Sequence, residues 1–448
     1  MNSVDSLLAF SGAASYEDLS DASREAAKTF LADAIAVGIS GSRDPAAHSV
    51  RTIVTGWGGG DRACVLGSER RLPAASAAYV NSFQVHCQEF DPLHEGATVH
   101  AMAVMTGALL AVAEDRNLSG KALLLGIAVG VEVAVTLGLA AREGLRFFRP
   151  ATAGALGAAV ALARMDEVAP DTARDVLGFT YSQLAGTMQA HVEGSVALPL
   201  QIAAAARAAV CSLDLAKGGL QAPHDVLDGA FGYFELYERG GSLEAWLGAM
   251  GKPWRITELA HKPFPTGRAA HAVLDALRRL GQTHSFSPGD IERIRATVPP
   301  LIKRLVARPA FKGMSVNYAR LCLGFLIPSL LRDGRIDAGT FTRERLADAE
   351  LLSFGSRTEF IEDSSHGTDV LSPQFVSVLL KDGSELGQEV PHTLGSPENP
   401  LSRQQRQEKF ALCVDGSGVP AAELANALAR VDELDSVREL LSLCVPAA

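Results

Sequence analysis

The chain has 448 residues, of which 47% are hydrophobic and 21% charged, so it is long enough for two domains and too apolar for a disordered protein. Its formal net charge of −10 argues against a nucleic-acid-binding protein, which usually presents a basic face. The six cysteines are scattered without metal or redox spacing, and the N-terminus lacks the segments of a signal peptide, which favours the cytoplasm.

Helical patterns dominate the chain as far as about residue 251. An amphipathic helix is expected over residues 15–41, followed by a loop with a small hairpin over residues 55–73. Residues 122–141 are apolar enough to span a membrane, but Glu132 would then lie near the bilayer centre at a high cost in free energy. We therefore expect this segment to form the centre of a helical domain, in a protein that does not enter membranes.

The pattern changes after Trp254. Residues 291–298 alternate between apolar and polar side chains as in a strand, and residues 374–386 are typical of two strands joined by a turn at Asp382-Gly383. The segment between them is typical of a helix. Residues 259–391 are therefore predicted to form a smaller α+β domain, and the amphipathic C-terminal segment is expected to return to the helical domain.

The densest group of titratable residues lies in "HCQEFDPLHEGATVH", residues 86–100, just before an apolar helix. Three interpretations compete. The simplest is a polar loop whose carboxylates cap the helix. A metal site is conceivable from the side-chain types, but no HExxH-like spacing occurs, and we predict no metal ligands. We favour an acid/base cluster, because titratable groups beside apolar walls acquire the shifted pKa values that proton transfer needs.

A second candidate group is basic and lies in "GLRFFRPATAGALGAA". Arg149 precedes a helix that begins near Pro150, a residue that the first turn of a helix tolerates. Free N–H groups at this helix start, together with guanidinium donors, would hold a carboxylate well. The alternative is a set of solvated surface arginines.

Two further segments carry candidate residues at helical spacing. In "HKPFPTGRAAHAVLDAL", Lys262 lies in a proline-rich loop, and Arg268 and His271 follow three residues apart, so that both can lie on one helical face. In "GMSVNYARL", Ser315 and Tyr318 are also three residues apart. Each of these signals is weak when it is taken alone, since a core tyrosine is commoner than a catalytic one.

Taken together, these segments resemble the MmgE/PrpD family along nearly the whole chain. The matching segments are Asn81 with "HCQEFDPLHEGATVH", then "FRPATAGALGAA", "KPFPTGRAAHAVLDA", "MSVNYARL", and the "NPLS…KF" signature from Asn399 to Phe410. The resemblance implies a mainly α fold, with a large all-helical domain built from residues 1–258 and 392–448 and the smaller α+β domain inserted over residues 259–391. It also implies a homodimer with the active site in the cleft between the two domains.

The resemblance also implies a class of chemistry. Activities of the family are 2-methylcitrate dehydration, cis-aconitate decarboxylation and iminodisuccinate epimerisation, which act on small polycarboxylates and need no organic cofactor. We therefore expect a cofactor-independent enzyme that removes a proton next to a carboxyl group. Either a dehydratase-type lyase or an epimerase is expected first.

Five residues match the site positions of the family's motifs, namely Glu89, Asp91, His100, Lys262 and Tyr318, and the remaining candidates are residues of this chain in or near the matching segments. The predicted catalytic residues are Glu89, Asp91, His94, His100, Lys262 and Tyr318, and the predicted substrate-binding residues are Arg149, Gln201, Arg268, His271 and Ser315. His100, oriented by Asp91 or Glu89, is expected to be the base, with Tyr318 or His94 as the acid. Arg149, Lys262 and Arg268 are expected to hold the substrate carboxylates.

The chain departs from the family at four positions, namely Pro92, Arg149, Leu198 and Gly267. The family has an aspartate, a histidine and a lysine at the first three, and decarboxylases resemble one another in having a histidine at the fourth. The absence of these family side chains argues against a decarboxylase. It also leaves open a relative that binds carboxylates but has lost its chemistry.

Overall fold

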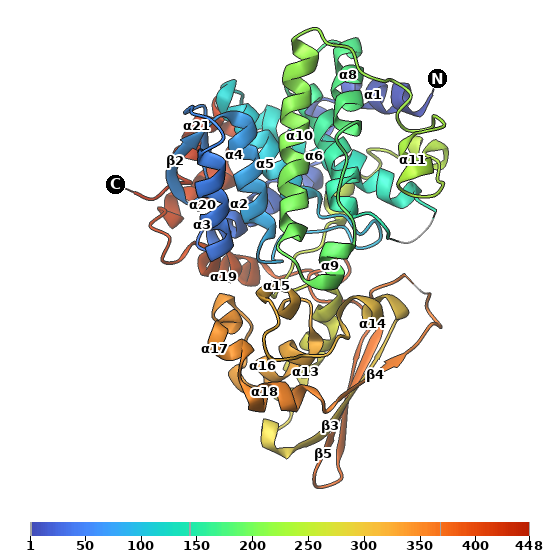
Figure 1. Ribbon diagram of the computed structural model, residues 1–448, viewed down its shortest axis with the longest axis vertical. Coiled ribbons are helices and arrows are strands. Elements are labelled where there is room, and N and C mark those ends of the chain that lie inside the picture. Colours follow the sequence, from blue (N-terminus) through green and yellow to red (C-terminus); the bar gives the residue numbers. More distant parts are fainter. Residues whose placement is uncertain (1, 143–144, 368, 448) are drawn as a thin grey trace.

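The computed structural model of the protein describes residues 2–142, 145–367 and 369–447. Figure 1 shows two lobes, a larger helical lobe that contains both chain termini and a smaller lobe that contains a sheet. The helices of the larger lobe are α1 (Ser3–Ala13), α2 (Asp21–Gly41), α3 (Pro45–Thr55), α4 (Ala74–His86), α5 (Ala101–Asp115), α6 (Gly120–Ala140), α7 (Ala153–Met165), α8 (Pro170–Tyr181), α9 (Gln189–Glu193), α10 (Ala197–Lys217), α11 (Tyr233–Leu236), α12 (Glu244–Leu247), α19 (Arg403–Val414), α20 (Ala421–Ala429) and α21 (Val437–Ser442). Its hairpin, β1 (Ala63–Val65) and β2 (Ser68–Leu72), confirms the predicted one.

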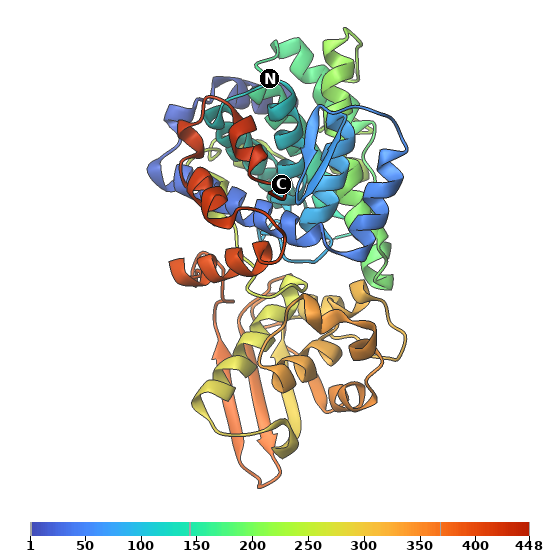
Figure 2. The ribbon, with the colours of Figure 1, turned by 90° about the vertical axis from the view of Figure 1, so that its left-hand side faces the viewer.

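The smaller lobe is built on a four-stranded sheet of order β4-β3-β5-β6. Its elements are α13 (His271–Thr283), β3 (Ile291–Val298), α14 (Pro300–Val306), α15 (Val316–Ala319), α16 (Leu323–Asp333), α17 (Arg343–Leu346), α18 (Ala349–Gly355), β4 (Thr358–Glu362), β5 (Gln374–Leu380) and β6 (Glu385–Val390). Strand β3 pairs with β4 in parallel and with β5 antiparallel, and α13 packs on β5 and β6 (Figure 2). The strand predicted at residues 291–298 and the pair around Asp382-Gly383 are confirmed, whereas β4 was not predicted.

Helix α6 is the apolar segment that raised the question of a membrane. Two helices, α6 and α10, are long and apolar enough to cross one, but almost all of α6 is buried inside the protein. Glu132, at its centre, accepts hydrogen bonds from the backbone N–H groups of Gly251 (2.9 Å) and Arg255 (2.6 Å). A position in the centre of the helical lobe thus explains the composition of α6, because a helix surrounded by protein is apolar on all sides.

Buried apolar side chains form two clusters, one in each lobe. The larger cluster combines residues from the first 259 positions with residues of the C-terminal helices, such as Leu424 and Leu440, whereas the smaller one extends from Phe264 to Val390. Figure 2 shows the C-terminal helices, in red, lying against the N-terminal ones in the helical lobe. Separate cores are consistent with the predicted domains, and their division at residues 258/259 and 391/392 stays a prediction.

Candidate active site

The titratable cluster lies where α4 ends and α5 begins. His86 is the last residue of α4, His100 immediately precedes α5, and the loop between them folds back through paired backbone hydrogen bonds of His94 and Val99. A second backbone pair, between Leu93 and Ala260, ties this loop to the segment that carries Lys262. The local fold therefore gathers residues that are far apart in the sequence.

Asp91 holds two histidines at once. Its Oδ1 atom lies 3.0 Å from Nδ1 of His86, and its Oδ2 atom lies 2.9 Å from Nδ1 of His100. The Asp91 side chain is completely buried, and the two imidazole rings meet edge to face with centroids 4.9 Å apart. A carboxylate that accepts from both Nδ1 atoms sets the orientation of each ring and leaves the Nε2 atoms pointing away from it.

Lys262 supplies the positive charge behind this network. Its Nζ atom donates to the Glu89 carboxylate (2.9 Å) and carbonyl (3.0 Å) and lies 3.9 Å from Oδ1 of Asp91, and the side chain is fully buried. Glu89 has a φ of 54°, which is uncommon for a residue other than glycine. Because Lys262 binds both ends of this residue, it stabilises the left-handed backbone as well as the charge.

The shifted pKa values follow from burial and from these neighbours. Burial disfavours a charged carboxylate, but Lys262 and the two histidines outweigh it, so that the pKa of Glu89 falls to about 2 and that of Asp91 falls well below its usual range. Burial likewise opposes a charge on His86, yet the Asp91 and Glu89 carboxylates raise its pKa. His100 is the exception, because burial outweighs Asp91 and lowers its pKa.

These directions determine which nitrogen of His100 carries the proton. Asp91 is ionised and can only accept, so Nδ1 of His100 carries the hydrogen of their 2.9 Å contact. The lowered pKa keeps the ring neutral, so Nε2 carries a lone pair. Among the described residues no hydrogen-bond partner of this Nε2 is found, and the ring lines a cavity. His100 is therefore arranged as a base.

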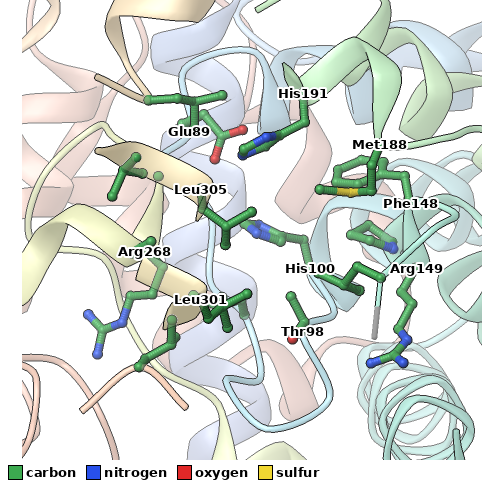
Figure 3. Close-up of a pocket in the computed structure, with 18 residues that line it drawn as sticks. Glu89, Thr98, His100, Phe148, Arg149, Met188, His191, Arg268, Leu301 and Leu305 are labelled. Atoms are coloured by element: carbon green, nitrogen blue, oxygen red, sulfur yellow. The ribbon is translucent and has the colours of Figure 1, made fainter. Parts of the chain in front are cut away.

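The cavity next to His100 has a volume of about 70 Å³ and lies between the two lobes. Figure 3 shows Glu89, His100 and His191 converging on it, with Phe148, Met188, Leu301 and Leu305 around them. Of these residues, Leu301 and Leu305 come from α14 of the smaller lobe. The helical lobe supplies Glu89, His100, Phe148, Met188 and His191. A set of polar groups on mostly apolar walls is the usual composition of a small-molecule site.

The two predicted substrate-binding arginines line this cavity, but their guanidinium groups bind protein carboxylates. Arg149 contacts Glu238 with Nε to both oxygens (3.1 Å each) and Nη2 to Oε2 (3.0 Å). Arg268 donates from Nε to Glu95 (2.6 Å) and from Nη1 to the carbonyls of His261 and Leu394. In Figure 3 both guanidinium groups point away from the space between His100 and His191. Their role as carboxylate ligands stays a prediction.

The other predicted residues occupy two kinds of position. Asp91 and Lys262 lie behind Glu89 and His100 and support them. Five residues are not among the described residues that line this cavity, namely His94, Gln201, His271, Ser315 and Tyr318. His94 pairs with Glu258 at 3.0 Å, His271 with the Thr266 carbonyl at 3.2 Å, and the Tyr318 hydroxyl donates to the Pro309 carbonyl at 2.9 Å.

Gln201 and Ser315 lie away from the cavity for similar reasons. The amide oxygen of Gln201 accepts from the backbone of Thr187 at 2.7 Å, and the Ser315 hydroxyl donates to the Gly194 carbonyl at 2.6 Å. Both side chains therefore stabilise the chain around α9, which carries His191. Their predicted direct contact with substrate stays a prediction.

Four residues of the site were not predicted from the sequence, namely His86, His191, Glu238 and Arg308. His86 lies inside the titratable cluster, so its proximity to Asp91 in the chain was an available signal. His191 is the only one of the four that lines the cavity in the part of the chain that is described. It lies three residues before Gly194, and its pairing with Arg308 depends on a contact between the lobes.

The cluster has side chains that are also metal ligands. Atoms of His86, Asp91 and His100 lie within 4.8 Å of one another. However, both Nδ1 atoms are bound to the Asp91 carboxylate, and the Lys262 ammonium lies 3.9 Å from the same carboxylate. Because an ammonium group already supplies the positive charge here, the donor set suits proton transfer better than it suits a metal cation.

Comparison with known proteins identifies the family of the chain. Residues 5–245 match the MmgE/PrpD N-terminal domain and residues 264–433 match the MmgE/PrpD C-terminal domain. The chain is 29% identical to cis-aconitate decarboxylase of Homo sapiens over 76% of this chain and 72% of that protein, and 27% identical to that of Mus musculus over 88% and 82%. It is 23% identical to cis-aconitate decarboxylase of Aspergillus terreus over 94% and 91%. The chain therefore belongs to the MmgE/PrpD family.

Proposed function

We propose that this protein is a lyase that acts on a small di- or tricarboxylate, with His100 as the base. The observation that carries the proposal is the neutral His100 ring, whose Nδ1–H is held by Asp91 and whose Nε2 lone pair faces a cavity with apolar walls. A base of this kind removes a proton from the carbon next to a carboxyl group. Exclusion of water by the walls strengthens the electrostatic interactions of the reacting groups.

The relatives support the class of reaction and of substrate. Their names describe a decarboxylase of cis-aconitate, which is a lyase that acts on a small tricarboxylate. The chain lacks the cationic side chains that were expected of a decarboxylase at residues 198 and 267, which are leucine and glycine. We therefore place elimination of water first and decarboxylation next within the lyase class.

The arginines set a condition on substrate binding. Arg149 and Arg268 line the cavity while their guanidinium groups bind Glu238 and Glu95. A substrate carboxylate that binds either arginine must therefore compete with the glutamate that the arginine already holds. This competition favours substrates with two or more carboxylates. Bidentate binding by arginine is strong enough for such competition.

The experiment is proton NMR of the purified protein in D₂O with 2-methylcitrate, citrate, cis-aconitate, trans-aconitate and iminodisuccinate. A vinyl signal indicates elimination, and itaconate signals indicate decarboxylation. Turnover by His100→Gln is expected to fall about 10²- to 10⁴-fold, the range that one acid/base group contributes. His224→Gln is the matched control, since His224 also pairs with an aspartate, Asp175 at 3.0 Å, but on the surface.

Near-full turnover by His100→Gln would contradict the assignment of the base. No product from any of the five compounds, with a folded protein, would contradict the proposed substrate class. A second candidate is an epimerase, which the second imidazole favours, because His191 faces the same cavity as His100 (Figure 3). Deuterium that enters an α-position of a substrate without a new product would identify it.

A further inference from the structure

His191 is a buried imidazole that lines the cavity from the helical lobe, next to Glu89 (Figure 3). It lies in the short helix α9, the residue is 9% exposed, and it lines the cavity. Figure 3 shows the ring directed at the space between Glu89 and His100. The hydrogen bonds of His191 therefore determine whether its ring presents a donor or an acceptor to a molecule bound in the cavity.

Arg308 determines which nitrogen of His191 carries the proton. Its Nη2 atom lies 3.3 Å from Nδ1 of His191, and its Nη1 atom donates to the carbonyl of the same residue at 3.1 Å. A guanidinium group can only donate, so Nδ1 must accept. In a neutral ring the hydrogen is then on Nε2, for which no partner is found among the described residues.

The charged and titratable groups that face His191 favour the neutral ring. They are Arg308 from the smaller lobe and Glu89 and His100 from the loop before α5. Burial and the Arg308 charge outweigh the attraction of Glu89 and lower the pKa of His191 to about 4. The ring is therefore uncharged at neutral pH.

Arg308 is itself fixed by contacts within the smaller lobe. Its Nη2 donates to the Leu305 carbonyl at 2.8 Å, and the guanidinium lies over the Tyr318 ring, 4.9 Å from its centroid. Tyr318 in turn packs against Gly194, three residues after His191. The tautomer of a side chain in one lobe is thus set by a residue that the other lobe holds in place.

The two imidazoles facing the cavity consequently have opposite polarity. His100 donates from Nδ1 to Asp91 and presents a lone pair at Nε2, whereas His191 accepts at Nδ1 from Arg308 and presents an N–H at Nε2. One ring can take a proton, and the other can donate a hydrogen bond without changing its charge. A substrate that loses a proton to His100 develops negative charge on a neighbouring oxygen, which an N–H donor stabilises.

We propose that His191 is a neutral Nε2–H donor that binds a substrate carboxylate and stabilises the oxyanion formed when His100 removes the α-proton. Arg308 is its positioning residue. The inference rests on the proposed function for the identity of the ligand. The tautomer and the charge of His191, by contrast, are properties of the protein alone.

Long-range ¹H–¹⁵N spectra of protein labelled with ¹⁵N-histidine test the inference directly. The His191 resonances, identified by their loss in His191→Gln, are expected to show the hydrogen on Nε2 and no protonation between pH 7.5 and pH 5.5. His271 is an internal reference for the same tautomer, because its Nε2 contacts the Thr266 carbonyl, and His100 should show the opposite one. In Arg308→Met, the His191 ring is expected to lose the fixed tautomer and to protonate at higher pH.

A second experiment measures ligand binding with tricarballylate, a saturated tricarboxylate that does not react. Its binding to the wild type should shift the His191 Nε2 resonance. His191→Leu should weaken binding about 10- to 100-fold, the effect of losing a hydrogen bond to a charged group, whereas His191→Gln, which keeps an N–H at a similar reach, should weaken it less.

A hydrogen on Nδ1 of His191, or a charged ring at pH 7, would overturn the inference, and the wild-type spectrum alone decides this even if a variant fails to fold. Tight binding of tricarballylate by His191→Leu would overturn it as well. If the wild type does not bind tricarballylate at all, the proposed substrate class fails, and the tautomer and pKa of His191 still decide the present assignment.

Discussion

At the scale of single residues, the site depends on a balance of buried charges. Glu89 and Asp91 are ionised inside the protein, and Lys262 with His86 offsets them. Charges in such surroundings are tolerated only when they are paired and hydrogen-bonded. Glu89, Asp91 and Lys262 were predicted from the sequence by their match to the family's motifs, whereas His86 was not. The protonation states of all four residues required the distances.

Removal of the Lys262 charge tests this balance. Lys262→Met is expected to lower the free energy of unfolding by about 3 to 5 kcal/mol, because two buried carboxylates lose their cation. Lys303→Met is the matched control, since Lys303 pairs with Glu362 at 3.7 Å with both side chains nearly half exposed, and its loss should cost less than about 1 kcal/mol. Urea denaturation measures both.

The pH dependence of Lys262→Met gives a second readout. The pKa of Glu89 is about 2 in the folded wild type, below the ordinary value of 4.5, so its contribution to stability is full above pH 4.5 and is lost as the pH falls toward 2. Without Lys262 this contribution should largely vanish. Equal costs for the two lysine variants would contradict the central role of Lys262.

At the scale of secondary-structure elements, short segments position the chemistry. The α4–α5 loop carries the base, and α9, which is followed by Gly194 as its C-cap, carries His191. The sequence predicted the helix over residues 15–41 with its start too early, because Ser20 caps α2 and residues 16–18 form a separate turn. Strand β4 was missed, since its pairing with β3 is non-local and its residues are mostly exposed.

The end of α9 can be tested with a pair of glycines. Gly194 has a φ of 64°, and a Cβ atom there would lie 2.5 Å from Cα of Tyr318. Gly194→Ala is therefore expected to cost about 2 to 4 kcal/mol of stability and to lower turnover by displacing His191. Gly219 has a φ of 85° but open space around it, so Gly219→Ala should cost only the backbone strain of about 1 to 2 kcal/mol and keep turnover.

Urea midpoints and steady-state kinetics of the two glycine variants give the comparison. The backbone strain is similar in both, so the difference between them measures the packing of α9 on α15. Indistinguishable turnover in the two variants would contradict a role for this contact in placing His191.

At the scale of the whole molecule, residues of both lobes line the candidate site. Contacts between Lys262 and Glu89, Arg268 and Glu95, and Arg308 and His191 cross between segments more than 100 residues apart. The same packing buries several histidines in neutral form. The pKa values of His100, His191, His261 and His271 are all lowered by burial.

These histidines should make the folded protein sensitive to mild acid. Below pH 6.5 these histidines take up protons in the unfolded chain but stay neutral in the folded protein, so the free energy of unfolding falls as the pH falls. For His191, with a pKa of about 4, the loss is about 2 kcal/mol at pH 5. His86 acts in the opposite direction, since its raised pKa stabilises the fold below pH 6.5. Because four of these histidines have a lowered pKa and one has a raised pKa, we expect a net loss of stability in acid. Urea midpoints at pH 7.5 and pH 5.0 measure the net effect.

His191→Gln should reduce this loss of stability, and His224→Gln, at an exposed site, should leave it unchanged. The same acid sensitivity in His191→Gln as in the wild type would contradict a buried neutral His191. This experiment needs no substrate, so it is independent of the reaction.

The sequence by itself determined the mainly α fold class, the strand β3, the β5–β6 turn and the cluster around His100, because periodicity, turn residues and short motifs are local properties of the chain. Only the tertiary structure decided that Arg149 binds Glu238, that Tyr318 lies outside the cavity and that Arg308 sets the tautomer of His191. The physical reason is that these contacts join residues about 90 or more positions apart, or depend on which way a side chain is turned. Both are set by the packing of the lobes, for which no local pattern in the sequence exists.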